Sequence, residues 1–242
     1  CEVLEVPKGD DLTLDVAGVE EAVRAAAAGR LEEQSGSPRI LFVVSPGNPS
    51  GRAVGLEGIE RLLALGLAVV VDEAYIEFGG QSAVDLLPAH DNLIILRTFS
   101  KWAGMAGLRL GYALLAPRLA EAMERIRLPY NVNAAAVVAA LATFEDLDGV
   151  RATVGRLIEE RERLGEGLSD IPYLEPLPSE ANFVLCRVAG RSAEEVVEGL
   201  LDRGIMVRGF SGSRMADYVR ISVGRPEQND ALLEALGELG WS

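Results

Sequence analysis

Histidine is almost absent from this sequence, since His90 is the only one among 242 residues. The two cysteines, Cys1 and Cys186, are too few for a framework of disulfides or for a zinc site made of cysteines. Metal centres built from histidines and Ser-His-Asp triads are nearly excluded by the scarcity of histidine. We therefore expect no metal site and little of the usual hydrolase chemistry.

Lysine is also scarce: Lys8 and Lys101 are the only two, against 21 arginines. Arginine remains protonated at physiological pH, whereas a lysine can lose its proton and act as an amine nucleophile. Lys101 precedes two glycines, Gly104 and Gly107, in an otherwise apolar setting. The count alone is equally compatible with chance, so other features must decide whether this lysine is a nucleophile.

The chain has fewer basic than acidic residues, with 23 Lys and Arg against 37 Asp and Glu, and its net charge is −14. Such a chain repels phosphate-rich surfaces, so we expect neither nucleic acid nor an anionic membrane as a partner. The sequence does not start with a basic segment and a long apolar run, and the apolar run 134–144 is too short to cross a membrane. These features predict a cytoplasmic globular protein.

Near-continuous apolar runs predict the strands of a first domain. These strands are expected at 38–45, 67–71, 92–97 and 108–115, and an alternating pattern predicts a further short strand at 1–6. Helices are expected at 16–28 and 56–65, and a polar loop at 30–37. Because helices alternate with strands that are apolar throughout, the pattern predicts an α/β fold. We expect a mainly parallel sheet with helices on both faces.

The last third of the sequence predicts a smaller α+β domain, which follows a proline-rich break at 172–179. Its strands are expected at 182–188, 205–208 and 218–223, and its helices at 193–203 and 229–239. Before the break, helices are expected at 118–127, 133–145 and 150–170. We therefore expect a large domain over residues 1–130, a connecting helix over 131–145 and a small C-terminal domain over 146–242.

Polar residues follow three successive predicted strands. In the turn 46–51, two prolines and two glycines leave Asn48 with a rigid backbone and a free amide. Asp72 ends an apolar strand that is expected to bury its carboxylate, and Tyr75 follows it. The third group contains Thr98, Ser100, Lys101 and Arg109. Ligands bind at the carboxyl ends of strands in open α/β sheets, so we expect one site here.

The chemistry of these groups matches pyridoxal 5′-phosphate, which has a phosphate, a basic ring nitrogen, a phenolic oxygen and an aldehyde. The two hydroxyls and the guanidinium of the third group suit the phosphate. Asp72 would keep the ring nitrogen protonated, while Asn48 and Tyr75 would hydrogen-bond the phenolic oxygen. Lys101 would condense with the aldehyde and then serve as general base and acid.

Each of these groups also has an ordinary structural explanation. Asn48 can be a simple turn residue, and Tyr75 can belong to the core. Asp72 and Glu73 can together cap a helix. The lysine can lie on a solvated loop, and the arginine that follows it can form a surface ion pair. All of these explanations would have to hold at three consecutive strand ends, so the shared site is favoured.

Several motifs span these positions. Pro-Gly-Asn-Pro-Ser-Gly lies at 46–51, Asp-Glu-Ala-Tyr at 72–75, and Thr-Phe-Ser-Lys-Trp-Ala-Gly-Met-Ala-Gly-Leu-Arg-Leu-Gly-Tyr at 98–112. Pro-Tyr-Asn-Val-Asn ends at Asn133, and Val-Arg-Ile-Ser-Val-Gly-Arg-Pro-Glu-Gln-Asn ends at Asn229. With them the sequence resembles the fold-type I pyridoxal-phosphate-dependent aminotransferases of classes I and II, most closely the family of histidinol-phosphate aminotransferases. The resemblance extends from the first residue to the C-terminus.

This resemblance implies that Lys101 is the lysine that forms a Schiff base with pyridoxal phosphate. It implies contacts with the cofactor ring for Asn48, Asp72 and Tyr75. It implies contacts with the cofactor phosphate for Thr98, Ser100 and Arg109.

For the substrate, the resemblance implies that Arg220 binds it, that Arg208 faces its phosphate, and that Asn48 is a further contact. Both arginines can equally be ordinary surface residues. The implied reaction transfers the amino group of glutamate to imidazole-acetol phosphate, giving histidinol phosphate and 2-oxoglutarate, in a homodimer. An aminotransferase for aromatic or other amino acids, a threonine-phosphate decarboxylase, and a non-catalytic module of the same fold remain alternatives.

The sequence departs from this family in two places. Gly47 stands where close relatives often have a second asparagine, and we expect this change to be harmless. The family's first hundred or so residues have no counterpart here, and they include a glycine turn at the cofactor phosphate and an aromatic residue that stacks on the ring. We therefore expect the native protein to be longer. We expect these 242 residues alone to bind the cofactor weakly and to turn over little.

Overall fold

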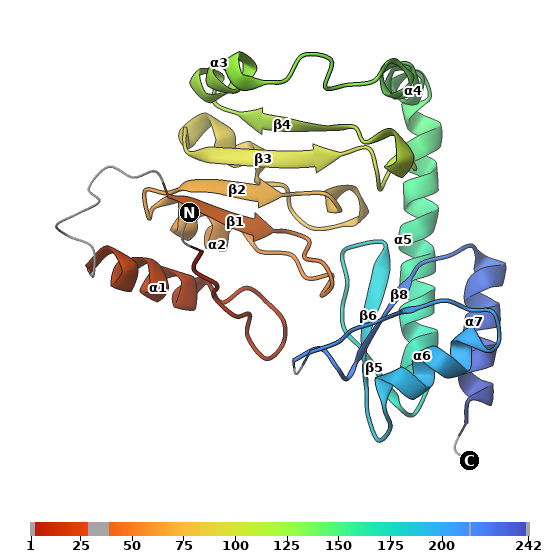
Figure 1. The fold of residues 1–242 in the computed structure, drawn as a ribbon. Coiled ribbons are helices and arrows are strands. Elements are labelled where there is room, and N and C mark those ends of the chain that lie inside the picture. Colours follow the sequence, from red (N-terminus) through yellow and green to blue (C-terminus); the bar gives the residue numbers. More distant parts are fainter. Residues whose placement is uncertain (1–2, 29–38, 213, 241–242) are drawn as a thin grey trace. The chain divides into compact units, whose positions relative to one another are not determined.

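The computed structural model describes residues 3–28, 39–212 and 214–240, and the chain divides into two compact units (Figure 1). The large unit comprises the residues up to Asp146, except for the two short segments 47–52 and 77–79. These segments join the C-terminal residues from Leu147 onward to make the small unit. The segment that carries Asn48 therefore belongs to the small unit.

The large unit contains one four-stranded sheet. Its strands, in spatial order, are β1 (Ile40–Val44), β2 (Ala68–Asp72), β3 (Leu93–Thr98) and β4 (Gly111–Leu115). The first three strands are parallel, and β4 runs antiparallel to β3. Val44 pairs with Asp72, and Asp72 pairs with Leu96, so the carboxyl ends of the three parallel strands meet at one edge. The expected mainly parallel sheet is confirmed.

Helices cover one face of this sheet. They are α1 (Val16–Ala28), α2 (Leu56–Leu63) and the 3-10 helix η2 (Ala83–Ala89). Ile59 and Leu62 of α2 are fully buried because the spacing of its apolar residues puts them on one side of the helix. Each contributes about 1.5–3 kcal/mol by leaving water. On the opposite face at the β1 end, Phe42 is 69% exposed, and the described residues provide no helical cover there.

Two further helices complete the large unit. Helix α3 (Pro117–Ile126) begins with a proline, which suits the first helical position, and α4 (Ala134–Glu145) begins after Asn133. The side chain of Asn133 caps α4 by accepting a hydrogen bond from the backbone N–H of Ala136 at 2.8 Å. Asn133 also donates to the carbonyl of Leu108 at 3.0 Å, which ties the start of α4 to the segment after Lys101.

The small unit contains an antiparallel sheet and three helices. The strands in spatial order are β5 (Leu174–Pro176), β6 (Phe183–Val188), β8 (Tyr218–Ser222) and β7 (Arg208–Gly209). The helices are α5 (Leu147–Ser169), α6 (Ala193–Leu201) and α7 (Pro226–Glu238). Its core is made by fully buried residues of all three helices and the two central strands, among them Leu164, Val196, Val219 and Leu236.

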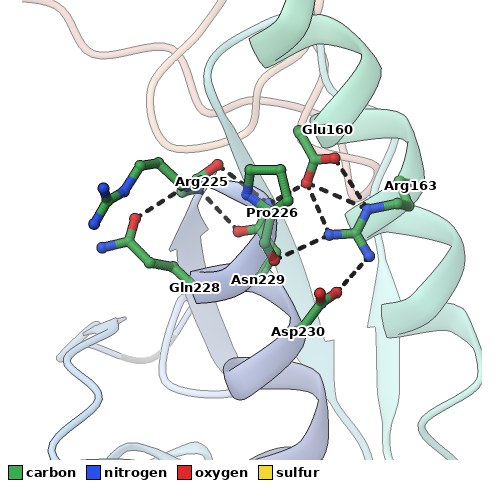
Figure 2. A network of polar contacts seen from close by, with 8 residues as sticks. Glu160, Arg163, Arg225, Pro226, Gln228, Asn229 and Asp230 are labelled. Carbon is green, nitrogen blue, oxygen red and sulfur yellow. Dashed lines mark hydrogen bonds and ion pairs between the residues drawn. The ribbon is translucent and has the colours of Figure 1, made fainter.

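A polar network joins α5 to α7 within the small unit (Figure 2). Arg163 donates to Glu160 at 2.8 Å and to Asp230 at 2.6 Å. Asn229, which is buried, donates to Glu160 at 2.9 Å and accepts from the N–H of Gly224 at 2.9 Å. Because a buried polar group must be paired, this network fixes both helices and the turn after β8.

Some expectations about the elements are wrong, and each failure has a physical reason. Residues 3–6 form no strand, because their alternating pattern has no strand beside it in the described chain. The proline-rich break contains β5, a short strand whose partner is β6. The strand expected at 205–208 is displaced to Arg208–Gly209, because pairing with β8 begins only there. The expected loop 30–37 lies outside the described residues.

Among the residues that the structure describes, no helix combines the length and the apolar character needed to cross a bilayer. Within the same residues, no group of three or more His, Cys, Asp and Glu side chains is placed to hold a metal ion.

Candidate functional site

Asp72 is the last residue of β2, and its carboxylate lies at the carboxyl end of the sheet. Its Oδ1 accepts a hydrogen bond from the N–H of Ala74 at 3.0 Å, so the side chain fixes the turn after the strand. No helix begins directly after Asp72, so the alternative that Asp72 and Glu73 cap a helix is wrong. The expected burial of Asp72 is wrong: it is half-buried, whereas the neighbouring Glu73 is 1% exposed.

The residues after β3 form a turn around the second group of polar side chains. Thr98 donates through Oγ1 to the carbonyl of Leu110 at 3.1 Å and accepts from the N–H of Ser100 at 3.0 Å. Arg109 has a φ of 55°, and it donates through Nη1 to the carbonyl of Ala106 at 3.0 Å. These local bonds position two hydroxyls and a guanidinium at the end of the strand.

One pocket of about 290 Å³ gathers these side chains in the large unit. It is lined by Asp72, Ala74, Leu96, Arg97, Thr98, Ser100, Lys101 and Arg109. The Nζ of Lys101 lies 5.4 Å from the ring centroid of Tyr75, which is itself buried. The structure thus brings together five of the expected residues in one pocket and places Tyr75 beside the lysine.

Aromatic side chains support the segment that carries Lys101. The ring centroid of Phe99 lies 5.4 Å from that of Trp102 and 5.7 Å from those of Tyr112 and Phe144. Pairs at these separations contribute about 0.5–1.5 kcal/mol beyond the area that they bury. The lysine is therefore exposed toward the pocket on a segment whose neighbouring residues are anchored in the core.

A buried ion pair lies next to this pocket, and sequence analysis did not find it. The Oε2 of Glu73 accepts hydrogen bonds from Nε and Nη2 of Arg97 at 3.0 and 2.9 Å. Its carboxylate also accepts from Ser82 Oγ at 2.9 and 3.0 Å and from the N–H of Ala83 at 2.6 Å. Burial lowers the pKa of Arg97, but the hydrogen bonds and charges of Glu73 and Tyr112 outweigh it and raise that pKa above its usual value.

The only sequence signal for this pair was the acidic residue that directly follows Asp72. Its partner, Arg97, lies 24 residues further along the chain, and the motif that identified Lys101 begins only at Thr98. The parallel pairing of β2 with β3 is what brings the two side chains together.

The remaining expected residues lie in the small unit. Asn48 accepts through Oδ1 from Nη1 of Arg220 at 2.7 Å, so the expectation that its amide is free is wrong. The guanidinium carbon of Arg220 lies 5.0 Å from the ring centroid of Phe183. Arg208 is exposed and pairs directly with Arg220 across β7 and β8, and its guanidinium carbon lies 5.9 Å from the ring centroid of Phe210.

The turn that carries Asn48 is tightly held within the small unit. Gly51 has a φ of 70° and donates its N–H to the carbonyl of Gly47 at 2.7 Å. The carbonyl of Gly51 accepts from the N–H of Glu180 at 2.8 Å, and this hydrogen bond attaches the turn to the loop before β6. Asn48 and Arg220 are thus two parts of one cluster, which joins an amide to a stacked guanidinium.

The pocket of the large unit can hold a ligand that carries a phosphate and a basic nitrogen. Its lining offers hydroxyls and a guanidinium, which bind phosphate, and a carboxylate, which pairs with a protonated nitrogen. It also offers one primary amine, from Lys101, which can attack a carbonyl carbon. These donors fit pyridoxal phosphate, and the volume is at the lower end of that usual for small-molecule sites.

The sequence is similar to a known protein family and to curated proteins. The profile of the aminotransferase class I and II family matches residues 1–236. Histidinol-phosphate aminotransferase from Roseiflexus castenholzii is 45% identical over 240 residues, which are 98% of this chain and 62% of that protein. The chloroplastic histidinol-phosphate aminotransferase of Nicotiana tabacum is 40% identical over 236 residues, 55% of its length. The chain therefore spans less than two thirds of the length of these relatives.

Solved structures of other proteins have a fold similar to that of this chain. Histidinol-phosphate aminotransferase from Sinorhizobium meliloti, in complex with pyridoxal-5′-phosphate, has a TM-score of 0.81 at 31% identity, over 98% of this chain and 64% of that one. A decarboxylase from Sulfurospirillum multivorans has a TM-score of 0.81 at 28% identity, over 99% of this chain and 70% of that one. These likenesses confirm the α/β fold class expected from the sequence.

Proposed function

The chain belongs to the class I and II aminotransferase family, and from this premise we propose that it is a pyridoxal-phosphate-dependent histidinol-phosphate aminotransferase. The proposed reaction transfers the amino group of glutamate to imidazole-acetol phosphate and yields histidinol phosphate and 2-oxoglutarate. The observation that carries the proposal is that one pocket gathers Asp72, Lys101 and Arg109 with two hydroxyls. Relatives at 40–45% identity that bear this name support the choice of substrate.

In this proposal, the two kinds of polar group in the pocket hold the two ends of the cofactor. The hydroxyls of Thr98 and Ser100 and the guanidinium of Arg109 bind its phosphate. The carboxylate of Asp72 accepts a hydrogen bond from the protonated ring nitrogen and keeps the proton there. Asn48 and Tyr75 donate to the phenolic oxygen.

When bound, the cofactor supplies an aldehyde and a cationic ring that stabilises negative charge on a neighbouring carbon. The primary amine of Lys101 would hold the cofactor at that aldehyde, and as a free amine it would serve as the base and acid that moves a proton between neighbouring atoms of the substrate. The buried ring of Tyr75 beside Nζ limits the positions that the amine can adopt. Arginine could not replace Lys101, because its guanidinium stays protonated.

Two arginines of the small unit are proposed to bind the substrate. Arg220 is held by Asn48 and stacks on Phe183, which presents its remaining N–H groups in a defined direction. Arg208 pairs with Arg220 across neighbouring strands and adds a second cation. Because the whole chain carries a net charge of −14, a phosphorylated substrate needs such local cations to be attracted.

A substrate panel tests the proposed specificity. The protein loaded with pyridoxal phosphate is given 2-oxoglutarate with histidinol phosphate, histidinol, an aromatic amino acid or threonine phosphate, and glutamate formation and carbon dioxide release are measured. We expect glutamate to form fastest with histidinol phosphate, and much more slowly with unphosphorylated histidinol. Carbon dioxide release from threonine phosphate would instead favour a decarboxylase, the activity named for one structural neighbour.

The proposal also includes a homodimer and a cytoplasmic location. The homodimer follows from the resemblance described above, whereas the location rests on the sequence features given before it, and the plant relatives are named as chloroplastic. Sedimentation of the protein at micromolar concentration checks the first part, since a single species of monomer mass would contradict it.

A further inference from the structure

A cluster around the buried Glu73 adjoins the pocket, and Glu73 itself lies on the face of the sheet opposite Asp72. Side chains alternate along a strand, so Glu73 points to the same side as Val69 and Val71, and Asp72 points to the other. The N–H of Glu73 donates to the carbonyl of Leu96 at 2.8 Å, which continues the ladder between β2 and β3 by one residue. Glu73 therefore lies at the last rung of the sheet, back to back with the pocket.

The partners of Glu73 come from two other segments of the large unit. Arg97 of β3 gives two hydrogen bonds, and Ser82 and Ala83, at the start of η2, give the rest. Arg97 also donates to Ser82 Oγ at 2.7 Å, so the cluster is closed on itself. Arg97 itself belongs to the pocket lining, and so does the next residue, Thr98.

Stability alone is a weak reason for this arrangement. A buried ion pair loses much of its electrostatic gain to desolvation, and apolar side chains of similar size often stabilise a protein as well. What this ion pair adds is a defined geometry, because two N–H groups of one guanidinium donate to the same carboxylate oxygen, Oε2 of Glu73. Here that geometry joins the residue after Asp72 to the residue before Thr98.

We propose that Glu73 and Arg97 are positioning residues that set the distance between the carboxylate of Asp72 and the phosphate-binding residues after β3. The inference rests on the proposed function, since only a ligand that reaches both ends of the pocket senses this distance. Pyridoxal phosphate carries a ring nitrogen for one end and a phosphate for the other. Pyridoxal and inorganic phosphate each engage one end, so the spacing does not matter to them.

Binding of these three compounds to charge-matched variants tests the inference. The variants are Arg97→Lys, and Glu73→Gln combined with Arg97→Met, and neither changes the net charge. We expect the double variant to raise the Kd of pyridoxal phosphate about tenfold, the scale of one lost charge-assisted hydrogen bond, and Arg97→Lys to raise it less. The Kd values of pyridoxal and of phosphate should change less than twofold. If the double variant does not fold, the Kd values of Arg97→Lys alone test the inference.

The matched control combines Glu160→Gln with Arg163→Met, which keeps the net charge and removes an ion pair of the small unit outside the pocket lining. It should lower the melting temperature and leave all three Kd values unchanged. The inference is overturned if the variants bind pyridoxal phosphate as the wild type does, or if all three Kd values rise together. If the wild-type protein binds phosphate but no pyridoxal phosphate, the proposed function fails first, and the inference falls with it.

Discussion

At the scale of single residues, Asp72 and Glu73 show how one position changes what a carboxylate can do. Asp72 faces the pocket with one hydrogen bond from its own turn, so its remaining lone pairs can receive a ligand. Glu73 has its lone pairs taken by a guanidinium, a hydroxyl and a backbone N–H. The first can therefore act on a bound molecule, whereas the second can only hold protein groups in place.

Replacing Asp72 by alanine should lower kcat about 10²–10³-fold, because the proposed ring nitrogen loses the charge that keeps it protonated. Steady-state transamination with saturating cofactor is the measurement. Asp91→Ala is the matched control, since Asp91 is 72% exposed and pairs only loosely with Arg118 at 3.6 Å. A near-normal rate in Asp72→Ala would show that the ring-nitrogen role is wrong.

At the site, the sequence predicts several residues that line the pocket but not which side chains contact each other. The placement of Asp72, Thr98 and Lys101 in one pocket could be predicted, because Asp72 and Thr98 directly follow apolar runs typical of strands and Lys101 comes three residues after Thr98. The ion pair of Glu73 with Arg97 could not, because it depends on which strands are neighbours and on which face each side chain lies. The bond between Asn48 and Arg220 joins residues 172 positions apart and could not be predicted for the same reason.

At the scale of elements, the sequence predicts a helix or strand correctly where the residues of that segment alone determine its structure. The helix expected at 16–28 is observed as Val16–Ala28, because its alanine-rich pattern is local. β5 and β7 were missed or misplaced, since three-residue and two-residue strands exist only through pairing with β6 and β8. The turn 46–51 was expected, but its close approach to the segment before β6 was not.

That close approach gives a prediction for Gly51→Ala. A Cβ at Gly51 would lie 2.7 Å from the Cβ and 3.0 Å from the Cα of Ser179, and the φ of 70° adds strain. Gly204→Ala is the control, because it has a similar φ of 75° and open space around it. In urea unfolding we expect the control to lose about 1 kcal/mol and Gly51→Ala about 1–3 kcal/mol more. Equal losses would mean that the turn does not pack against Ser179 as described.

At the scale of the whole molecule, electrostatics links stability to pH through the network between α5 and α7 (Figure 2). Hydrogen bonds from Arg163, then from Asn229, lower the pKa of Glu160 below its ordinary value of 4.5, although burial alone would raise it. The folded protein therefore binds this proton less tightly than the unfolded chain. The stabilisation is present above pH 4.5 and is lost as the pH falls through the folded pKa.

Comparing urea unfolding at pH 7 and at pH 3 should show this loss. The wild type should lose more unfolding free energy over this interval than Glu160→Gln, which has no carboxyl proton to bind. Glu166→Gln, an exposed change on the same helix, should lose as much as the wild type. An identical pH dependence in the wild type and Glu160→Gln would contradict the role of this network.

The central claim concerns one amine of the whole chain, and the scarcity of lysine makes it easy to test. Lys8 is the one rival side chain, and burial lowers its pKa below the ordinary value for lysine. The protein is incubated with pyridoxal phosphate, reduced with borohydride, digested and mapped by mass spectrometry. We predict a stoichiometric pyridoxyl group on Lys101 and none on Lys8. A group on Lys8, or on neither lysine, would contradict the account.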